Sequence, residues 1–296
     1  MTTTPRFHCP LPLAEGAEIA LPDAAAHHAA RVLRLAAGDA VTLLDGDDGE
    51  FDARILRIEP RGVHVRIEAA HAADRESPLA VTLVQGLAAA DRMDYAIQKA
   101  VELGVQSIQP VTMARSVARL DERRAAKRAL HWRQVTIAAC EQCGRNQLPR
   151  LHPLVGFDAW LGASSEAPLR LLLAPDGDIT LGSLAAPDGP VEILVGPEGG
   201  LTPEENRCRT PPWFSRGAAG TADSAHRYRG TCGARGAQRA MGRLALVGCC
   251  ANSPGGSRRP WLADESANEP PLTGRTVRSM SAIPCRCWSL RVLDPT

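Results

Sequence analysis

A glycine-rich turn is the part of this sequence whose residue types and spacing could do chemistry. Gly196, Gly199 and Gly200 follow the apolar run VEILV (191–195) and precede TPEEN (202–206). This order predicts a buried strand, a tight turn and a capped helix. In an open α/β sheet, ligands bind beyond the carboxyl ends of the strands, where glycines let the backbone approach closely. The spacing fits neither the Walker loop nor the dinucleotide-binding fingerprint, so a plain turn stays open as the alternative.

An α/β domain over residues 76–206 is expected to position this turn. Apolar runs alternate there with helical stretches, which is the order of a largely parallel sheet. VTLVQ (81–85) and LRLLLA (169–174) are expected to be buried strands, because they are short and mostly apolar. The stretches 91–103 and 121–143 are expected to be helices, because their apolar residues recur at helical spacing.

A small barrel is expected ahead of this domain, over residues 1–73. Between residues 16 and 70 the apolar residues alternate in short runs, such as AVTLLD (40–45), and turn residues separate the runs. This pattern predicts small antiparallel strands. HHAARVLRL (27–35) is expected to form a short helix between them.

Charge is divided unevenly along the 296 residues. Residues 206–296 hold 14 arginines, no lysine and five acidic residues, whereas residues 1–205 hold 20 basic and 28 acidic residues. Such asymmetry is typical of a nucleic-acid-binding tail or of a tail that was never selected as protein. The chain has no apolar run of membrane-helix length and no signal-peptide plan at its start, so we expect a cytoplasmic protein without membrane contact.

Cysteine and histidine spacing does not indicate a metal site. Cys140 and Cys143 form a CxxC pair, but zinc would require a second pair or histidines at suitable spacing. We therefore interpret the pair as structural. His27 and His28 are interpreted as packing or RNA-backbone residues rather than as metal ligands.

Four stretches of the chain share their pattern with one known family. They are HHAARVLRLAAGD (27–39), DRMDYAIQKAVELGV (91–105), EQCGR (141–145) and LVGPEGGLTPEE (194–205). In this order and at these spacings they resemble the RsmE family of 16S rRNA (uracil-N3)-methyltransferases. The resemblance extends over residues 1 to about 205.

The resemblance implies a fold, a cofactor and a substrate. The fold would be α/β, with a PUA-like β-barrel that grips RNA followed by a SPOUT methyltransferase domain whose chain ties a deep trefoil knot. S-adenosylmethionine would lie bent in the knot of a homodimer. The product would be a uridine methylated at N3 in the 16S ribosomal RNA of the small subunit. The cofactor-binding residues would be Pro175, Gly196, Pro197, Glu198, Gly199 and Gly200.

Arginines are expected to contact the RNA substrate, because residues 1–205 contain only two lysines. The resemblance places Arg145 at a helix end that faces RNA, near Glu141, and both are candidates for substrate positioning. Methylation of N3 requires its proton to leave, so a cation such as Arg145 or Arg92 could stabilise charge on the uracil oxygens. The general base stays unassigned. The candidate RNA-binding residues are Arg6, Arg31, Arg34, Arg92 and Arg115, and an ordinary surface position is the alternative for each arginine.

The sequence departs from the family after Asn206. The family continues through a stretch close to LGPRILRTETA, which is absent here. AGTADSAHRYRG (219–230) can be encoded so that a reading one base later gives LGPRILRTDTA, which leads to the hypothesis of a single-nucleotide frameshift near Asn206. As written, residues 207–296 lack periodic apolar faces, so we expect this tail to be disordered.

Two further function classes stay open. One is a non-catalytic RNA-binding protein, or an inactive frameshifted product, built on the barrel. The other is an α/β enzyme that binds a phosphate or nucleotide and uses the glycine turn as an anion site.

Overall fold

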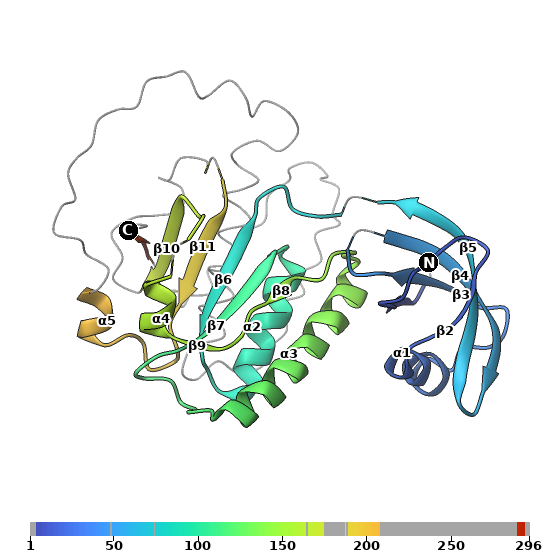
Figure 1. Ribbon diagram of the computed structural model, residues 1–296, viewed down its shortest axis with the longest axis horizontal. Helices are drawn as coiled ribbons and strands as arrows, with labels where there is room; N and C mark the ends of the chain where they lie inside the picture. Colours follow the sequence, from blue (N-terminus) through green and yellow to red (C-terminus); the bar gives the residue numbers. More distant parts are fainter. Residues whose placement is uncertain are drawn as a thin grey trace, which may run out of the picture.

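Two β-sheets form the body of the protein, which is described by a computed structural model (Figure 1). The structure describes residues 4–47, 49–73, 75–163, 165–174, 187, 189–207 and 289–293. A five-stranded sheet has the order β1-β3-β4-β5-β2, and a seven-stranded sheet has the order β12-β10-β11-β6-β7-β8, with β9 also pairing with β7. Among the described helices none combines the length and the apolar character needed to cross a membrane.

The five-stranded sheet is built as the apolar alternation predicts. Its elements are β1 (Arg6–His8), β2 (Glu18–Ala20), α1 (Asp23–His27), the π-helical turn η1 (His28–Val32), β3 (Ala40–Leu44), β4 (Gly49–Glu59) and β5 (Gly62–Ala72). Val63, Val65 and Ile67 alternate along β5 and are all buried in one core, which α1 covers. Three of the four strand pairs are antiparallel as expected, but β1 runs parallel to β3. The expected helix at 27–35 begins earlier, at Asp23, and ends at Val32.

The seven-stranded sheet carries its helices on both faces. Its strands are β6 (Val81–Gly86), β7 (Ser107–Thr112), β8 (Arg150–Leu151), β9 (Val155–Gly156), β10 (Leu169–Ala174), β11 (Val191–Val195) and β12 (Ser289–Leu293). Its helices are α2 (Ala90–Glu102), α3 (Glu122–Cys143), α4 (Phe157–Leu161) and α5 (Pro203–Arg207). The strand order β10-β11-β6-β7 is parallel throughout, as the apolar runs predict.

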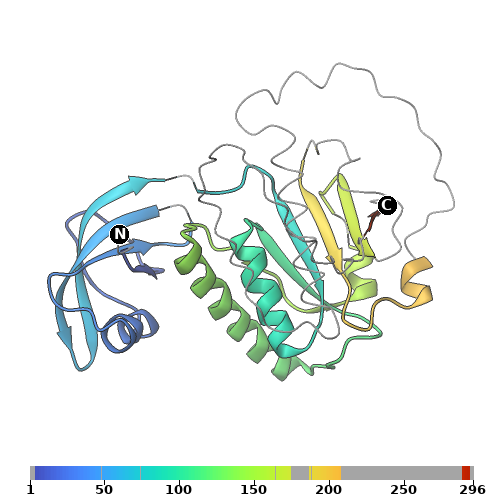
Figure 2. The same cartoon turned by 180° about the vertical axis from the view of Figure 1, so that it is seen from behind.

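Alternate residues of these parallel strands pack against different helices. Leu83 on β6 and Ile193 on β11 belong to the core beneath α2 and α3, whereas their neighbours Val84 and Leu194 belong to a second core with Trp160 of α4. This two-residue period explains why the strands are apolar along their whole length, because both faces are covered. Figure 2 shows α2 and α3 side by side against the sheet, with α3 nearest to the five-stranded sheet.

The chain beyond Asn206 is described only in part. Ser289–Leu293 form β12, which pairs antiparallel with β10. For these five residues the expectation of disorder is wrong, because β10 offers them an edge on which to pair. Residues 208–288 and 294–296 lie outside the described residues, and with them the frameshift hypothesis and the segments that a trefoil knot would need.

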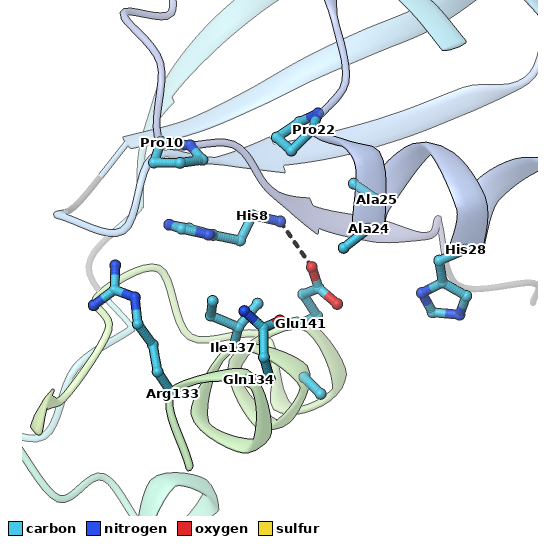
Figure 3. Close-up of a pocket in the computed structure, with 11 residues that line it drawn as sticks. His8, Pro10, Pro22, Ala24, Ala25, His28, Arg133, Gln134, Ile137 and Glu141 are labelled. Carbon is cyan, nitrogen blue, oxygen red and sulfur yellow. Dashed lines mark hydrogen bonds between the residues drawn. The ribbon is translucent and has the colours of Figure 1, made fainter. Parts of the chain in front are cut away.

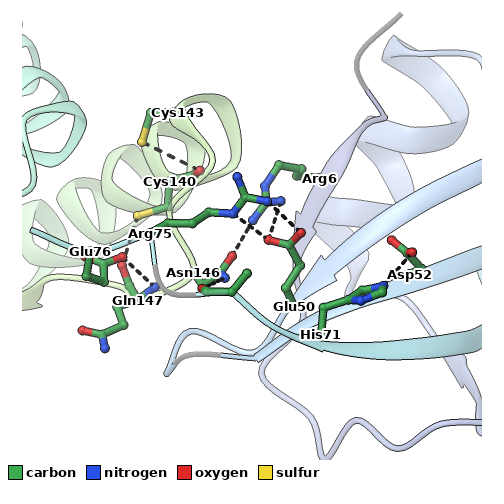
Figure 4. A network of polar contacts seen from close by, with 11 residues as sticks. Arg6, Glu50, Asp52, His71, Arg75, Glu76, Cys140, Cys143, Asn146 and Gln147 are labelled. Atoms are coloured by element: carbon green, nitrogen blue, oxygen red, sulfur yellow. Dashed lines mark hydrogen bonds and ion pairs between the residues drawn. The ribbon is translucent and has the colours of Figure 1, made fainter.

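Hydrogen bonds fix the two sheets against each other. Arg6 of β1 donates to Glu50 Oε2 at 3.0 Å and to Asn146 Oδ1 at 2.6 Å (Figure 4). Asn146 in turn donates to the carbonyl of Ala73 at 3.0 Å. The N–H of Leu148 donates to the Gly46 carbonyl at 2.9 Å. The junction is therefore tied by backbone and side chains from both sheets.

Candidate active site

Three loops meet at the carboxyl edge of the parallel strands. The glycine loop (residues 196–201) follows β11, residues 87–89 follow β6, and residues 113–118 follow β7. Because β6 lies between β11 and β7 and all three are parallel, their carboxyl ends share one edge. This is the edge at which α/β proteins bind ligands, as the sequence predicts.

The backbone of the glycine loop lies directly against the end of β6. A Cβ atom added at Gly86 would lie 2.7 Å from the nitrogen of Pro197, so no larger residue fits there. Gly200 has φ +67° and donates its N–H to the Pro197 carbonyl at 2.8 Å, which closes the turn. Glycine is therefore required at Gly86 because no side chain fits there, and it is favoured at Gly200 because of the positive φ.

Glu198 ties the glycine loop to α2. Its Oε1 accepts the N–H of Ala89 at 2.9 Å, at the first turn of the helix, and the Nε of Arg92 lies 3.7 Å from the same oxygen. The other oxygen, Oε2, is buried and has no hydrogen-bond partner among the described residues. Arg92, which was expected to bind RNA, thus lies beside the glycine loop.

A second glutamate ties the same loop to the segment after β7. Glu205 Oε1 accepts the N–H of Ala114 and Oε2 accepts the N–H of Thr202, both at 2.8 Å. Thr202 Oγ1 accepts the N–H of Glu205 in return at 3.2 Å, which makes a capping box at the start of α5. The sequence predicts Thr202 as the N-cap of this helix and Glu205 as an acid of its first turn, and their spacing of three residues is the signal of such a box.

Arg115 completes the contact between these loops. Its Nη1 donates to the Gly199 carbonyl at 3.1 Å, and a Cβ atom added at Gly199 would lie 3.0 Å from the Arg115 Cβ. The structure therefore gathers five of the six expected cofactor residues, together with Arg92 and Arg115, at one edge. The sixth, Pro175, lies outside the described residues, just beyond the end of β10.

The arrangement fits a ligand that carries hydrogen-bond donors. The Oε2 of Glu198 and the Oε1 of Gln85, at the end of β6, are both buried acceptors without a partner in the described part of the chain. Buried polar atoms are rarely left unpaired, so a bound group with N–H or O–H donors would satisfy them. S-adenosylmethionine, the cofactor that the sequence resemblance implies, carries amino and hydroxyl groups of this kind.

Arg145 does not lie at this edge and does not face solvent. It is 5% exposed, and its guanidinium donates to both Glu76 oxygens and to the carbonyls of Val101 and Val105 at 3.0 and 2.8 Å. Val105 precedes β7, so Arg145 occupies the amino edge of the sheet, opposite the glycine loop. The expected exposure to RNA is not found, and neither is the alternative of a surface position, because Gly144 turns the chain inward after α3 with φ +86°.

Glu141 also lies away from the glycine loop. Its Oε1 accepts the N–H of His8 at 2.9 Å, and burial raises the pKa of its carboxyl group. Together with His8 it lines a cavity of about 320 Å³ between α3 and the five-stranded sheet (Figure 3). The two residues expected to position the substrate, Glu141 and Arg145, thus belong to the junction of the sheets.

The remaining expected RNA-binding arginines divide into two kinds. Arg6 is a structural residue, because its side chain is 13% exposed and is bound to Glu50 and Asn146. The structure places Arg6 in the junction of the two sheets, where Glu50 and Asn146 already occupy its guanidinium. Arg31 and Arg34 are exposed, with no ion-pair partner among the described residues. Between them Val32 and Leu33 are also exposed, which makes a basic and apolar surface.

The two cysteines of the CxxC pair differ, since Cys143 is exposed and only Cys140 is packed in the structure. Cys140 is buried, and burial raises the pKa of its thiol to about 12, so it stays protonated and unreactive. Its Sγ contacts the Gln147 carbonyl at 3.6 Å. The described residues contain no group of three potential metal ligands.

Two family models match the chain. A model of the RNA methyltransferase PUA domain matches residues 21–68, within the five-stranded sheet and its helix. A model of the RNA methyltransferase domain matches residues 75–209, which include the glycine loop.

Solved structures and sequence relatives agree with these models. The ribosomal RNA small subunit methyltransferase E of Neisseria gonorrhoeae, solved with S-adenosylmethionine bound, is 39% identical with a TM-score of 0.66 and covers 70% of this chain and 85% of its own. A methyltransferase of Legionella pneumophila, also solved with bound S-adenosylmethionine, is 30% identical with a TM-score of 0.69, and the match covers 84% of this chain and 98% of that one. The ribosomal RNA small subunit methyltransferase E of Buchnera aphidicola from Schizaphis graminum is 28% identical over 184 residues, which are 62% of this chain and 75% of that protein.

The N-terminal sheet therefore has the PUA-like role in this architecture and the seven-stranded sheet the role of the methyltransferase domain. The glycine loop, with its contacts to Ala89 and Ala114, lies inside the matched methyltransferase region. With relatives of up to 39% identity aligned over most of their length, the chain belongs to the ribosomal RNA small subunit methyltransferase E family.

Proposed function

We propose that this protein transfers a methyl group from S-adenosylmethionine to N3 of a specific uridine in the 16S ribosomal RNA of the small subunit. The observation that carries the proposal is the glycine loop at the carboxyl edge, which Glu198 and Glu205 tie to the loops after β6 and β7. The family and its two solved relatives with S-adenosylmethionine support the identity of the cofactor.

The residues of the loop would hold the cofactor rather than react with it. Gly196, Pro197, Glu198, Gly199 and Gly200 would supply backbone contacts, and the unpartnered Glu198 Oε2 would accept a hydrogen bond from an amino or hydroxyl group. S-adenosylmethionine supplies an electrophilic methyl group when it is bound. Holding the uracil in line with that group is then most of the catalytic work.

Arg92 is the residue that we assign to the uracil. It lies on the first turn of α2, its side chain is 32% exposed, and its Nε is 3.7 Å from Glu198. A cation there would stabilise the negative charge that spreads onto the uracil oxygens as N3 loses its proton. Arg145, which is buried against Glu76, would not contribute directly.

The partner and the cellular setting follow from the same proposal. The substrate would be the small subunit or its RNA in the cytoplasm, and the active form would be a homodimer. The exposed surface Arg31 to Arg34 would contact RNA phosphates, since neither arginine has an ion-pair partner among the described residues.

Methyl transfer to small subunits tests the proposal. Subunits purified from a strain that lacks the modification are incubated with the protein and tritiated S-adenosylmethionine, and the digested RNA is analysed for 3-methyluridine. We expect label in that nucleoside, and no label with subunits that already carry it. RNA binding without transfer, by a chain that does bind the cofactor, would instead support the non-catalytic alternative.

Arg92→Ala sharpens this test. We expect kcat to fall by about a hundredfold, which is typical when one group that stabilises developing charge is removed. The KM for S-adenosylmethionine should change little. Arg61→Ala is the control. It removes the same charge from the exposed turn between β4 and β5, which contributes no residue to the glycine loop, and it should leave kcat unchanged.

A further inference from the structure

The cavity between the two sheets has no role in the proposed chemistry. Its volume is about 320 Å³, which lies within the range of small-ligand sites. One wall comes from the five-stranded sheet and α1, with His8, Pro10 and Pro22, and the other from α3, with Arg133 and Glu141 (Figure 3). None of its lining residues belongs to the glycine loop, and Glu141 lies in the last turn of α3, close in sequence to Arg145.

The wall from α3 presents polar groups at helical spacing. Arg133, Gln134 and Glu141 all line the cavity, and Ile137 and Ala138 lie between them. The side chains of Arg133 and Gln134 have no hydrogen-bond or ion-pair partner among the described residues. A cation, an amide and a carboxylate therefore converge on one space.

The opposite wall presents flat and apolar surfaces. Pro10, Pro22 and the rings of His8 and His28 line it. Burial lowers the pKa of His8, and the charge of Arg133 lowers it further, so both favour the neutral ring. Neutral aromatic and proline faces are suited to stacking against a planar ring.

Hydrogen bonds between the two sheets hold the cavity open. His8 N–H donates to Glu141 at 2.9 Å, and Arg6 bonds to Asn146 at 2.6 Å, so both walls are fixed relative to each other. The folded chain therefore holds the cavity in shape before a ligand binds, so binding requires little further loss of conformational entropy from the walls.

We propose that this cavity holds one unpaired nucleotide of the RNA substrate, at a position other than the methylated uridine. Arg133 binds its phosphate, Gln134 and Glu141 bind the edge of its base, and His8 stacks on the base. Arg31 belongs to the same helical turn as His28 (η1, His28–Val32), so RNA bound at the exposed surface Arg31 to Arg34 can continue into the cavity. Sequence-specific RNA recognition generally uses bases displayed in this way. That the nucleotide belongs to the RNA substrate rests on the proposed function.

Mononucleotides test the cavity without methyl transfer. The full chain, labelled in its histidines, is titrated with AMP, CMP, GMP and UMP, and with ribose 5-phosphate and inorganic phosphate, each up to about 10 mM. Ring signals of His8 and His28 report on the cavity, and His131, which is bonded to Asp94 at 2.7 Å outside it, is the internal control. We expect at least one nucleotide to shift the first two signals and not the third.

Variants distinguish binding in the cavity from nonspecific attraction between the nucleotide and positive charge on the protein. Arg133→Ala should weaken nucleotide binding about tenfold, the effect of one charge-assisted hydrogen bond, whereas Arg61→Ala should not change it. Ala138→Leu keeps every charge but fills part of the cavity, and should also weaken binding. In methyl-transfer assays Arg133→Ala should raise the KM for the subunit and leave kcat unchanged.

Three results would overturn the proposal. They are no shift with any nucleotide, equal shifts with inorganic phosphate, and binding that Arg133→Ala and Ala138→Leu leave intact. Each is independent of methyl transfer. If nucleotides bind in the cavity but the protein methylates no RNA, the proposed function fails and the nucleotide site stands.

Discussion

The two edges of the seven-stranded sheet are held together by different chemistry. At the carboxyl edge, Glu198 and Glu205 accept backbone N–H groups from neighbouring loops. At the amino edge, Arg145 pairs with Glu76, and beyond it Arg6 and Arg75 both bind Glu50. The first arrangement leaves one carboxylate oxygen, Glu198 Oε2, available to a ligand, whereas the second pairs the charges of both partners. The same residue types thus indicate a binding site at one edge and a structural joint at the other.

Arg145→Ala should have the largest effect, on stability. The substitution leaves Glu76 buried and removes the donors to the carbonyls of Val101 and Val105. Loss of one partner of a buried pair typically costs about 3–5 kcal/mol. Urea denaturation should show this loss, and Arg61→Ala should stay within about 0.5 kcal/mol of the parent chain. Unchanged stability with lost methyl transfer would instead return Arg145 to a catalytic role.

Restoring the reading frame after Asn206 should have the next largest effect, on cofactor binding. The chain as written lacks the family stretch that follows the glycine loop. We expect it to bind S-adenosylmethionine about a hundredfold more weakly than the frame-restored chain, or by about 2.7 kcal/mol. Calorimetry on both chains measures the difference, and equal affinities would contradict it. Sequencing the DNA around codon 206 tests the frameshift itself.

Glu198→Ala should have a smaller effect, which appears both in stability and in cofactor binding. It removes the carboxylate that caps α2, at a cost of about 1 kcal/mol in unfolding free energy. It also removes the unpartnered Oε2, so the KM for S-adenosylmethionine should rise about tenfold. Glu205→Ala is the matched control, since it loses similar backbone bonds but has no unpartnered oxygen. Equal KM changes in both variants would show that loop geometry alone matters.

Glu141→Gln should have the smallest effect on stability, which it changes only in its pH dependence. The raised pKa of Glu141 means that the folded chain holds the proton more tightly than the unfolded chain. The stabilisation is complete below the ordinary value of 4.5 and is lost as pH rises through the raised pKa. The glutamine stays neutral and still accepts the His8 N–H. Relative to the parent, its urea midpoint should therefore rise over this pH range, and a constant difference would contradict the assignment.

The strands and the glycine loop could be predicted from the sequence because their signals are local. The period of two on β5 and the apolar runs of β6 and β11 need only neighbouring residues. The burial of Arg145 could not be predicted, because Glu76 lies 69 residues away and no pattern links them. The burial of Arg6 has the same cause, with partners 44 and 140 residues away.

The cap that Glu198 places on α2 changes what the amino end of this helix offers to a ligand. A helix of 13 residues normally attracts anions to its amino end, where backbone N–H groups point outward. Here a carboxylate of the chain already fills that position. A phosphate at this helix end would meet a negative oxygen rather than open N–H groups, so the second of the two further function classes, an enzyme with an anion-binding turn, is disfavoured. A ligand group that donates N–H or O–H bonds instead meets the unpartnered Oε2 of Glu198. Negative charge on a ligand is left to Arg92 and Arg115, so the same edge offers an acceptor and two cations at different places.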